Sequence, residues 1–122
     1  MQIIKINETK VQTDPIPIAP DAGGVTVQRV VSQEMTDAVM FIVANFDAGV
    51  KNKFHVHPHD QIVLSLSGKG IAATRDKENI LEPGMLAHIP KGEEHRHGAL
   101  PEGPASLASI IPVPTAPTRV VD

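Results

Sequence analysis

The chain has 122 residues, of which 41% are hydrophobic and 20% charged, which is typical of one compact domain with a single core. It contains no cysteine, which excludes disulfide frameworks, thiolate metal sites and cysteine nucleophiles. The formal net charge of -3 and an aromatic content of 2% argue against nucleic-acid binding, which relies on cationic surfaces and stacking rings.

Short apolar runs separated by Gly and Pro dominate the chain, and this pattern is typical of a β protein with a sandwich or barrel architecture. A helical turn is expected only at residues 32–37. We expect strands at residues 3–6, 25–31, 39–46, 54–57, 61–67, 71–75, 79–82, 86–89 and 105–111.

The two ends of the chain are rich in proline, which cannot donate a backbone hydrogen bond to a sheet. We therefore expect an N-terminal arm at residues 1–24 and a C-terminal tail at residues 112–122, both at sheet edges or outside the sheets. Solvated ends and contact with a partner both stay open. The prolines concerned are Pro15, Pro17, Pro20, Pro112, Pro114 and Pro117.

All six histidines lie between His55 and His97. His55 and His57 alternate along a predicted strand, so their imidazoles leave the same face and can meet one divalent ion. Gln61 follows directly after the next turn, and His95 comes from far along the chain. This arrangement predicts a metal site that forms only when the domain folds.

Two motifs carry a resemblance to a known family. The first runs from Gly49 through His55-Val56-His57 and Gln61 to Gly68, and the second from Gly84 through Pro90-Lys91-Gly92 and His95 to Ala99. Their order and spacing resemble the cupin superfamily in its small single-domain form, with residues 49–99 as the core of one domain covering residues 1–122.

This resemblance implies an all-β double-stranded β-helix, also called a jelly-roll barrel, that holds one divalent transition metal: Mn, Fe, Ni or Zn. It implies His55, His57, Gln61 and His95 as ligands. The family usually has glutamate where this chain has Gln61, so the ligand set brings no negative charge and leaves the full charge of the ion to act on substrate. The same exchange weakens affinity for a hard cation, so loss of the metal also stays open.

Further candidates surround these ligands. His97 shares a strand face with His95, and we expect it to support the metal ligands, to act as a general base or to be a buried structural imidazole. Lys53, two residues before His55, is expected to place its ammonium near the metal, or else at the surface. His59 competes with Gln61 as a ligand or lies in a turn, and His88 has a structural role.

Strand alternation also predicts the wall of a substrate pocket, made of apolar and small side chains that face the barrel interior. These residues are Ile42, Ala44, Phe46, Val63 and Ser65.

We expect the protein to act on a small molecule and to have no nucleic-acid or membrane partner. The start of the chain lacks a signal-peptide pattern, so we expect a cytoplasmic location. Apolar residues on the outer face of residues 61–67 suggest a homodimer.

Within the superfamily, the chain is similar to manganese-dependent hydroxynitrile-lyase-like cupins, to unsaturated-uronate-processing cupins and to quercetinase-like dioxygenases. This similarity implies metal-dependent lyase or isomerase chemistry, or dioxygenation of an enolizable substrate. A non-catalytic module that binds or senses a small ligand is the alternative.

Overall fold

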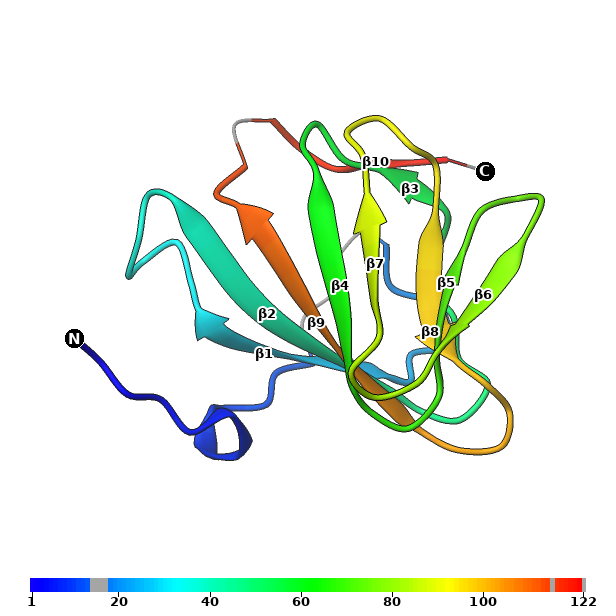
Figure 1. Ribbon diagram of the computed structural model, residues 1–122, viewed down its shortest axis with the longest axis horizontal. Coiled ribbons are helices and arrows are strands. Elements are labelled where there is room, and N and C mark those ends of the chain that lie inside the picture. Colours follow the sequence, from blue (N-terminus) through cyan, green and yellow to red (C-terminus); the bar gives the residue numbers. More distant parts are fainter. Residues whose placement is uncertain (14–17, 115, 122) are drawn as a thin grey trace.

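The computed structural model describes residues 1–13, 18–114 and 116–121. Ten strands and one short helical turn follow one another along these residues (Figure 1). They are η1 (Ile6–Glu8), β1 (Val25–Val31), β2 (Val39–Phe46), β3 (His55–Val56), β4 (Gln61–Ser67), β5 (Gly70–Ala73), β6 (Glu78–Leu81), β7 (Leu86–Ile89), β8 (Arg96–Ala99), β9 (Ala105–Pro112) and β10 (Arg119–Val120). None of the described segments is a helix that could cross a lipid bilayer.

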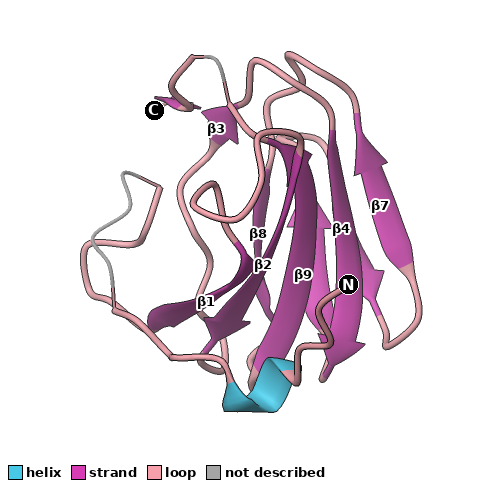
Figure 2. Ribbon diagram, turned by 90° about the vertical axis from the view of Figure 1, so that its left-hand side faces the viewer, coloured by secondary structure: helices cyan, strands magenta, loops and turns pink. Residues whose placement is uncertain are grey.

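The strands form three antiparallel sheets, and Figure 2 shows the long strands β2, β9 and β4 lying side by side. The largest has the order β1-β2-β9-β4-β7, the second β6-β5-β8, and the third pairs β10 with β3. Every strand pairing among the described residues is antiparallel. This arrangement confirms the predicted all-β jelly roll.

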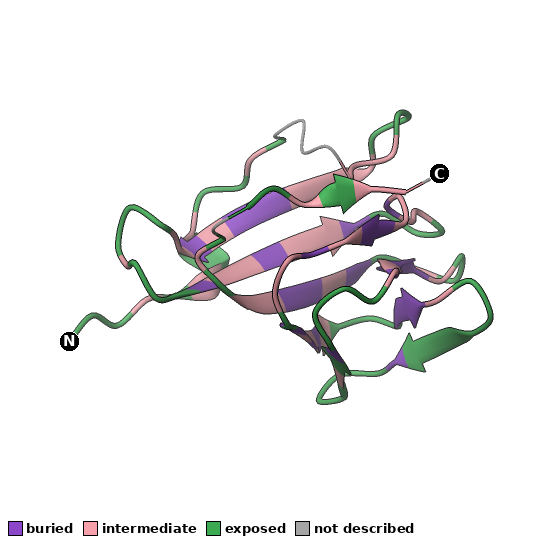
Figure 3. Ribbon diagram, turned by 90° about the horizontal axis from the view of Figure 1, so that it is seen from above, coloured by how far each residue is buried: buried purple, intermediate pink, exposed green. Residues whose placement is uncertain are grey.

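The core lies between the five-stranded and three-stranded sheets, and Figure 3 shows buried segments on strands of both. Phe46, Val63 and Leu107 come from the larger sheet and pack in one apolar cluster with Ala72 and Ala99 of the smaller one. On β4, the side chains that face this core are buried and alternate with half-buried ones, as expected for a strand with one face turned inward. The interior face therefore continues from the apolar core to Gln61 at the start of β4.

The predicted strand at residues 3–6 is wrong. Ile4 and Ile6 instead pack on the outer face of the large sheet, against the cluster around Val43. The side-chain amide of Gln28 donates to the carbonyl of Ile6 at 3.0 Å, which fixes the segment without strand pairing. This segment also covers part of the outer surface near Leu64; the homodimer stays a prediction.

The other predicted strands are present, with both ends confirmed for β1, β2, β4 and β7 and shifts of one or two residues elsewhere. β8 and β10 were not among the expected strands. Residues 32–37 form no helix; they make a turn in which the N–H of Met35 donates to the carbonyl of Ser32.

The prolines give a mixed result. Pro112 is the last residue of β9 and lies opposite Val39, whereas Pro20, Pro114 and Pro117 lie outside the strands. Pro15 and Pro17 fall outside the described residues.

Close packing of β8 against the segment before β3 depends on Gly98. A Cβ at this position would lie 2.5 Å from the carbonyl oxygen of Val50 and 2.8 Å from the Cα of Lys51. Ala99 donates its N–H to the same Val50 carbonyl at 2.9 Å. The absence of a side chain at Gly98 thus lets the two histidine-bearing segments lie next to each other.

Candidate metal centre

Backbone pairing brings the two histidine motifs together. The N–H of His55 donates to the carbonyl of His95 at 2.9 Å, and the N–H of His95 donates back at 3.1 Å. Next to this pair, the side-chain oxygen of Asn52 accepts from the N–H of His97 at 2.8 Å, and the N–H of Asn52 donates to the carbonyl of His97. Residues about forty positions apart in the chain are thereby locked side by side.

Three buried imidazoles form a compact group. Ring nitrogens of His55, His95 and His97 lie within 4.8 Å of one another. The ring of His57 lies beside them, with its centroid 4.8 Å from that of His55 and 5.3 Å from that of His95. We call these four residues the histidine cluster.

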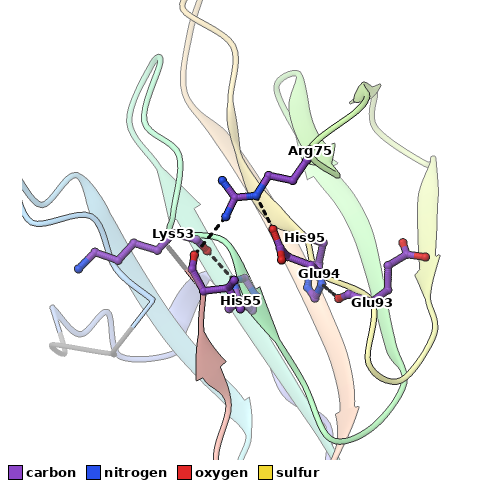
Figure 4. Close-up of polar contacts among 7 residues, drawn as sticks. Lys53, His55, Arg75, Glu93, Glu94 and His95 are labelled. Carbon is purple, nitrogen blue, oxygen red and sulfur yellow. Dashed lines mark hydrogen bonds and ion pairs between the residues drawn. The ribbon is translucent and has the colours of Figure 1, made fainter.

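Carbonyl groups determine which nitrogen carries the proton in two of the rings (Figure 4). Nδ1 of His55 lies 2.6 Å from the carbonyl oxygen of Lys53, and Nδ1 of His95 lies 2.8 Å from that of Glu93. Because a carbonyl oxygen only accepts hydrogen bonds, Nδ1 is the protonated nitrogen in each neutral ring. Their Nε2 atoms therefore keep free lone pairs, the form in which histidine binds a metal.

The remaining Nε2 atoms fit the same arrangement. Within the described part of the chain, the Nε2 atoms of His55, His57 and His97 are buried and have no hydrogen-bond partner. Buried polar atoms in proteins are nearly always paired, so three such atoms in one place require an explanation. A cation bound among them would satisfy these atoms together.

Gln61 completes the donor set. Its amide nitrogen donates to the hydroxyl of Ser109 at 2.9 Å, so its Oε1 atom points the other way and lies 3.0 Å from Nε2 of His95. Since the proton of neutral His95 is on Nδ1, two lone pairs face each other across this distance. Imidazole nitrogens and an amide oxygen are a donor set that fits a divalent transition ion.

Burial keeps all four rings neutral. Burial, followed by the neighbouring imidazoles, lowers the pKa of His57 to about 3. Burial also lowers the pKa of His55 to about 4, lowers the pKa of His95 and holds the pKa of His97 well below its usual value. At neutral pH the cluster is therefore deprotonated and ready to act as ligands.

Of the two positions expected for Lys53, the structure shows the one at the surface, and the one near the metal is wrong. Its ammonium lies 2.8 Å from the carboxylate of Asp21 at the protein surface, and Figure 4 shows the side chain extending away from His55. The N–H of Lys53 pairs with the carbonyl of Ile18, so this residue precedes β3 and does not follow its alternation. What Lys53 gives the site is its carbonyl oxygen.

Other predicted residues also have defined places. His97 belongs to the cluster itself, which the motif spacing did not indicate. His59 stacks on His57, with centroids 5.1 Å apart, while Gln61 is the side chain that faces His95. His88 lies on the outer face, 3.0 Å from the carboxylate of Asp60.

The expected pocket wall divides into two parts. Phe46 and Val63 are buried in the apolar core, Ala44 packs against it, and Ser65 is buried nearby on the same face of β4. Ile42 lines a separate cavity of about 600 Å³. The other residues lining this cavity are Gln12, Arg29, Ser32, Gln33, Glu34 and Met40.

Sequence reasoning missed three residues that support the histidine cluster or Gln61. They are Asn52, Ser109 and Thr118, whose hydroxyl lies 2.8 Å from Nδ1 of His57. Thr118 is 61 residues from its partner, so no local motif could have indicated this contact.

The sequence matches the Cupin_2 family of cupin domains over residues 42–111, more than half of the chain. The chain is a cupin. Among curated proteins, none matches the sequence.

Solved structures agree with this fold. The polyketide cyclase RemF from Streptomyces resistomycificus superposes with a TM-score of 0.88 at 18% identity, over 100% of this cupin and 86% of the cyclase. A sugar phosphate isomerase of the cupin superfamily from Silicibacter pomeroyi gives 0.81 at 17% identity, over 99% and 82% of the two chains. A cupin-like protein from Thermotoga maritima gives 0.72 at 27% identity, over 80% and 75%.

Proposed function

We propose that this cupin is an enzyme that acts on an oxygen-bearing small molecule in a lyase or isomerase type of reaction. Its cofactor is one divalent transition ion, Mn, Fe, Ni or Zn. The proposal rests on three observations: ring nitrogens of His55, His95 and His97 lie within 4.8 Å of one another, the buried Nε2 atoms of His55 and His97 have no partner among the described residues, and Oε1 of Gln61 faces Nε2 of His95 at 3.0 Å.

The residues that would hold the ion are the four imidazoles of the histidine cluster and Gln61. A divalent ion bound there supplies Lewis acidity to an oxygen atom of a bound molecule. Since every donor is neutral, none of the charge of the ion is cancelled by a ligand. This favours polarisation of a carbonyl or hydroxyl group as the chemistry of the site.

The protein's own groups orient this donor set. Backbone carbonyls hold the rings of His55 and His95, and Ser109 holds the amide of Gln61. Such outer contacts fix the ring orientation and the tautomer of a ligand. His97, considered above as a general base, fits better as a donor because burial keeps its pKa low and its buried Nε2 has no hydrogen-bond partner among the described residues.

Two of the enzymes named among the similar structures are a cyclase and an isomerase. At below 20% identity their likeness establishes only the fold. Their names nevertheless agree with a cupin barrel that supports rearrangement of a single small molecule.

Metal content is the first test. Protein purified without an affinity tag or chelating column is analysed by mass spectrometry, together with His95→Ala and His88→Ala variants. We expect about one transition ion per chain in the wild type and in His88→Ala, and loss of the ion in His95→Ala.

Two further results would change the proposal. A protein that carries no ion and takes up none of Mn, Fe, Ni or Zn would be a metal-free ligand-binding module. A metal-loaded protein that consumes dioxygen at an oxygen electrode with an enolizable substrate would be a dioxygenase, and the lyase or isomerase assignment would fall.

A further inference from the structure

The C-terminal tail returns to the histidine cluster and pairs with β3, the strand that carries His55. After Pro117 the chain runs antiparallel to β3, with Val120 opposite His55 and Arg119 opposite Val56. The N–H of Val121 then donates to the carbonyl of Phe54 at 2.8 Å. Figure 1 shows β10 lying along β3, whose His55 is paired on its other side with His95.

This register places Thr118 directly across from His57. Continuing the pairing of β10 with β3 by one position makes residues 118 and 57 opposite each other, and opposed residues of an antiparallel pair have their side chains on the same face. The hydroxyl oxygen of Thr118 accordingly lies 2.8 Å from Nδ1 of His57. The contact is a consequence of how the tail pairs.

The neighbouring histidines show what this contact does. Nδ1 of His55 and Nδ1 of His95 each meet a backbone carbonyl two residues earlier, which fixes their tautomer. For His57 the partner in this position is the Thr118 hydroxyl. If the hydroxyl donated to Nδ1 instead, the proton of neutral His57 would lie on Nε2, which is buried and has no partner among the described residues, and an unsatisfied buried donor is costly.

We propose that Thr118 is a positioning residue that accepts the Nδ1 proton of His57 and so directs the Nε2 lone pair of His57 into the cluster. The role of this contact in metal binding rests on the proposed function. The tautomer of His57 is a property of the metal-free protein and does not depend on that function.

The first part of the test reads the tautomer directly. Imidazole ¹⁵N chemical shifts of the full-length, metal-free protein are assigned to His57 by comparison with a His57→Gln variant. We expect the Nδ1–H tautomer in the wild type and in Thr118→Ser, and a change towards Nε2–H in Thr118→Val. A wild-type His57 in the Nε2–H form would overturn the proposal, whether or not any variant folds.

The second part measures Zn²⁺ and Mn²⁺ affinity by calorimetry. We expect Thr118→Val to weaken binding about tenfold and Thr118→Ser to stay within about twofold of the wild type, the range typical of contacts that orient a ligand. Equal affinities for Thr118→Val and the wild type would contradict a role in metal binding. If the wild type binds no ion, the proposed function fails, while the tautomer experiment still decides the role of Thr118.

Discussion

The same residue type occurs in two different environments in this small barrel. Four histidines lie inside it, buried, while His59 is half-buried and His88 is exposed on the outer face. The two outer histidines have partners close by along the chain or on the surface: Nδ1 of His59 lies 2.9 Å from the carbonyl oxygen of Asp60, and Nε2 of His88 lies 3.0 Å from the carboxylate of Asp60.

The inner histidines differ from the outer ones in how their two ring nitrogens are used. In His55, His57 and His95, Nδ1 has a hydrogen-bonding partner on the protein side, and the Nε2 atoms of His55, His57 and His97 are buried without one. The comparison teaches that a histidine becomes a ligand candidate when the fold buries one of its ring nitrogens and directs no hydrogen-bond donor at it. Clustering in the sequence alone does not separate the two groups.

The largest effect that this comparison predicts is on the stability of the metal-free protein against pH. An inner histidine has a lowered pKa when folded, about 4 for His55 and about 3 for His57, and near 6.5 when unfolded. The unfolded chain therefore binds more protons as the pH falls below 6.5, and the free energy of unfolding should fall by up to about 1.4 kcal/mol per pH unit for each such group. The stability that these groups contribute is fully present above pH 6.5.

Urea unfolding of the metal-free protein at pH 7.5, 6.5, 5.5 and 5.0 measures this loss. The control is His88→Gln, which alters an outer histidine and should keep the wild-type slope. A free energy of unfolding that stays constant between pH 6.5 and 5.0 would show that the inner rings are not held neutral by burial.

The next largest effect concerns metal affinity. His95→Ala removes a donor and leaves Gln61 Oε1 without the atom that it faces, and we expect affinity for Zn²⁺ to fall by more than about 100-fold, beyond the loss typical of an orienting contact. His88→Ala removes an imidazole of the same size from the outer face, and its affinity should match the wild type. Calorimetric titration of both variants measures the difference, and similar losses in the two would refute the assignment of inner and outer roles.

A smaller effect is expected at Gln61. Gln61→Glu adds a negative charge to a neutral donor set, and we expect Zn²⁺ to bind about tenfold more tightly, equivalent to about 1.4 kcal/mol. Gln61→Ala removes the oxygen donor and should weaken binding by a similar factor. If the two variants shift the affinity in the same direction, Gln61 does not contact the ion.

The fold was largely predictable because its signals are local. Gly and Pro turns separate the apolar runs, and β4 alternates buried and more exposed side chains as its sequence indicates. β10 could not be found in this way, because it consists of two residues behind a proline-rich stretch and depends on a partner that is distant in the sequence.

The site was predictable only as far as its motifs extend. Spacing pointed to His55, His57, Gln61 and His95, and the structure brings these residues together with His97. Contacts made by tertiary pairing, such as that of Thr118 with His57, leave no pattern in a single sequence. Alternation failed where pairing stops, as at Lys53.

The smallest expected effect follows from that failure. Lys53→Met removes an ammonium that is paired with Asp21 at the surface but keeps the backbone carbonyl that accepts from Nδ1 of His55. Because an exposed ion pair contributes little, the affinity for Zn²⁺ should stay within about twofold of the wild type, as in the matched control Lys51→Met, which removes another surface ion pair. A loss confined to Lys53→Met would mean that the ammonium leaves Asp21 and turns towards the cluster. Lys53 would then have to be counted among the residues that act on the site. An unchanged affinity would instead show that a residue beside a metal ligand can support it through its main chain alone.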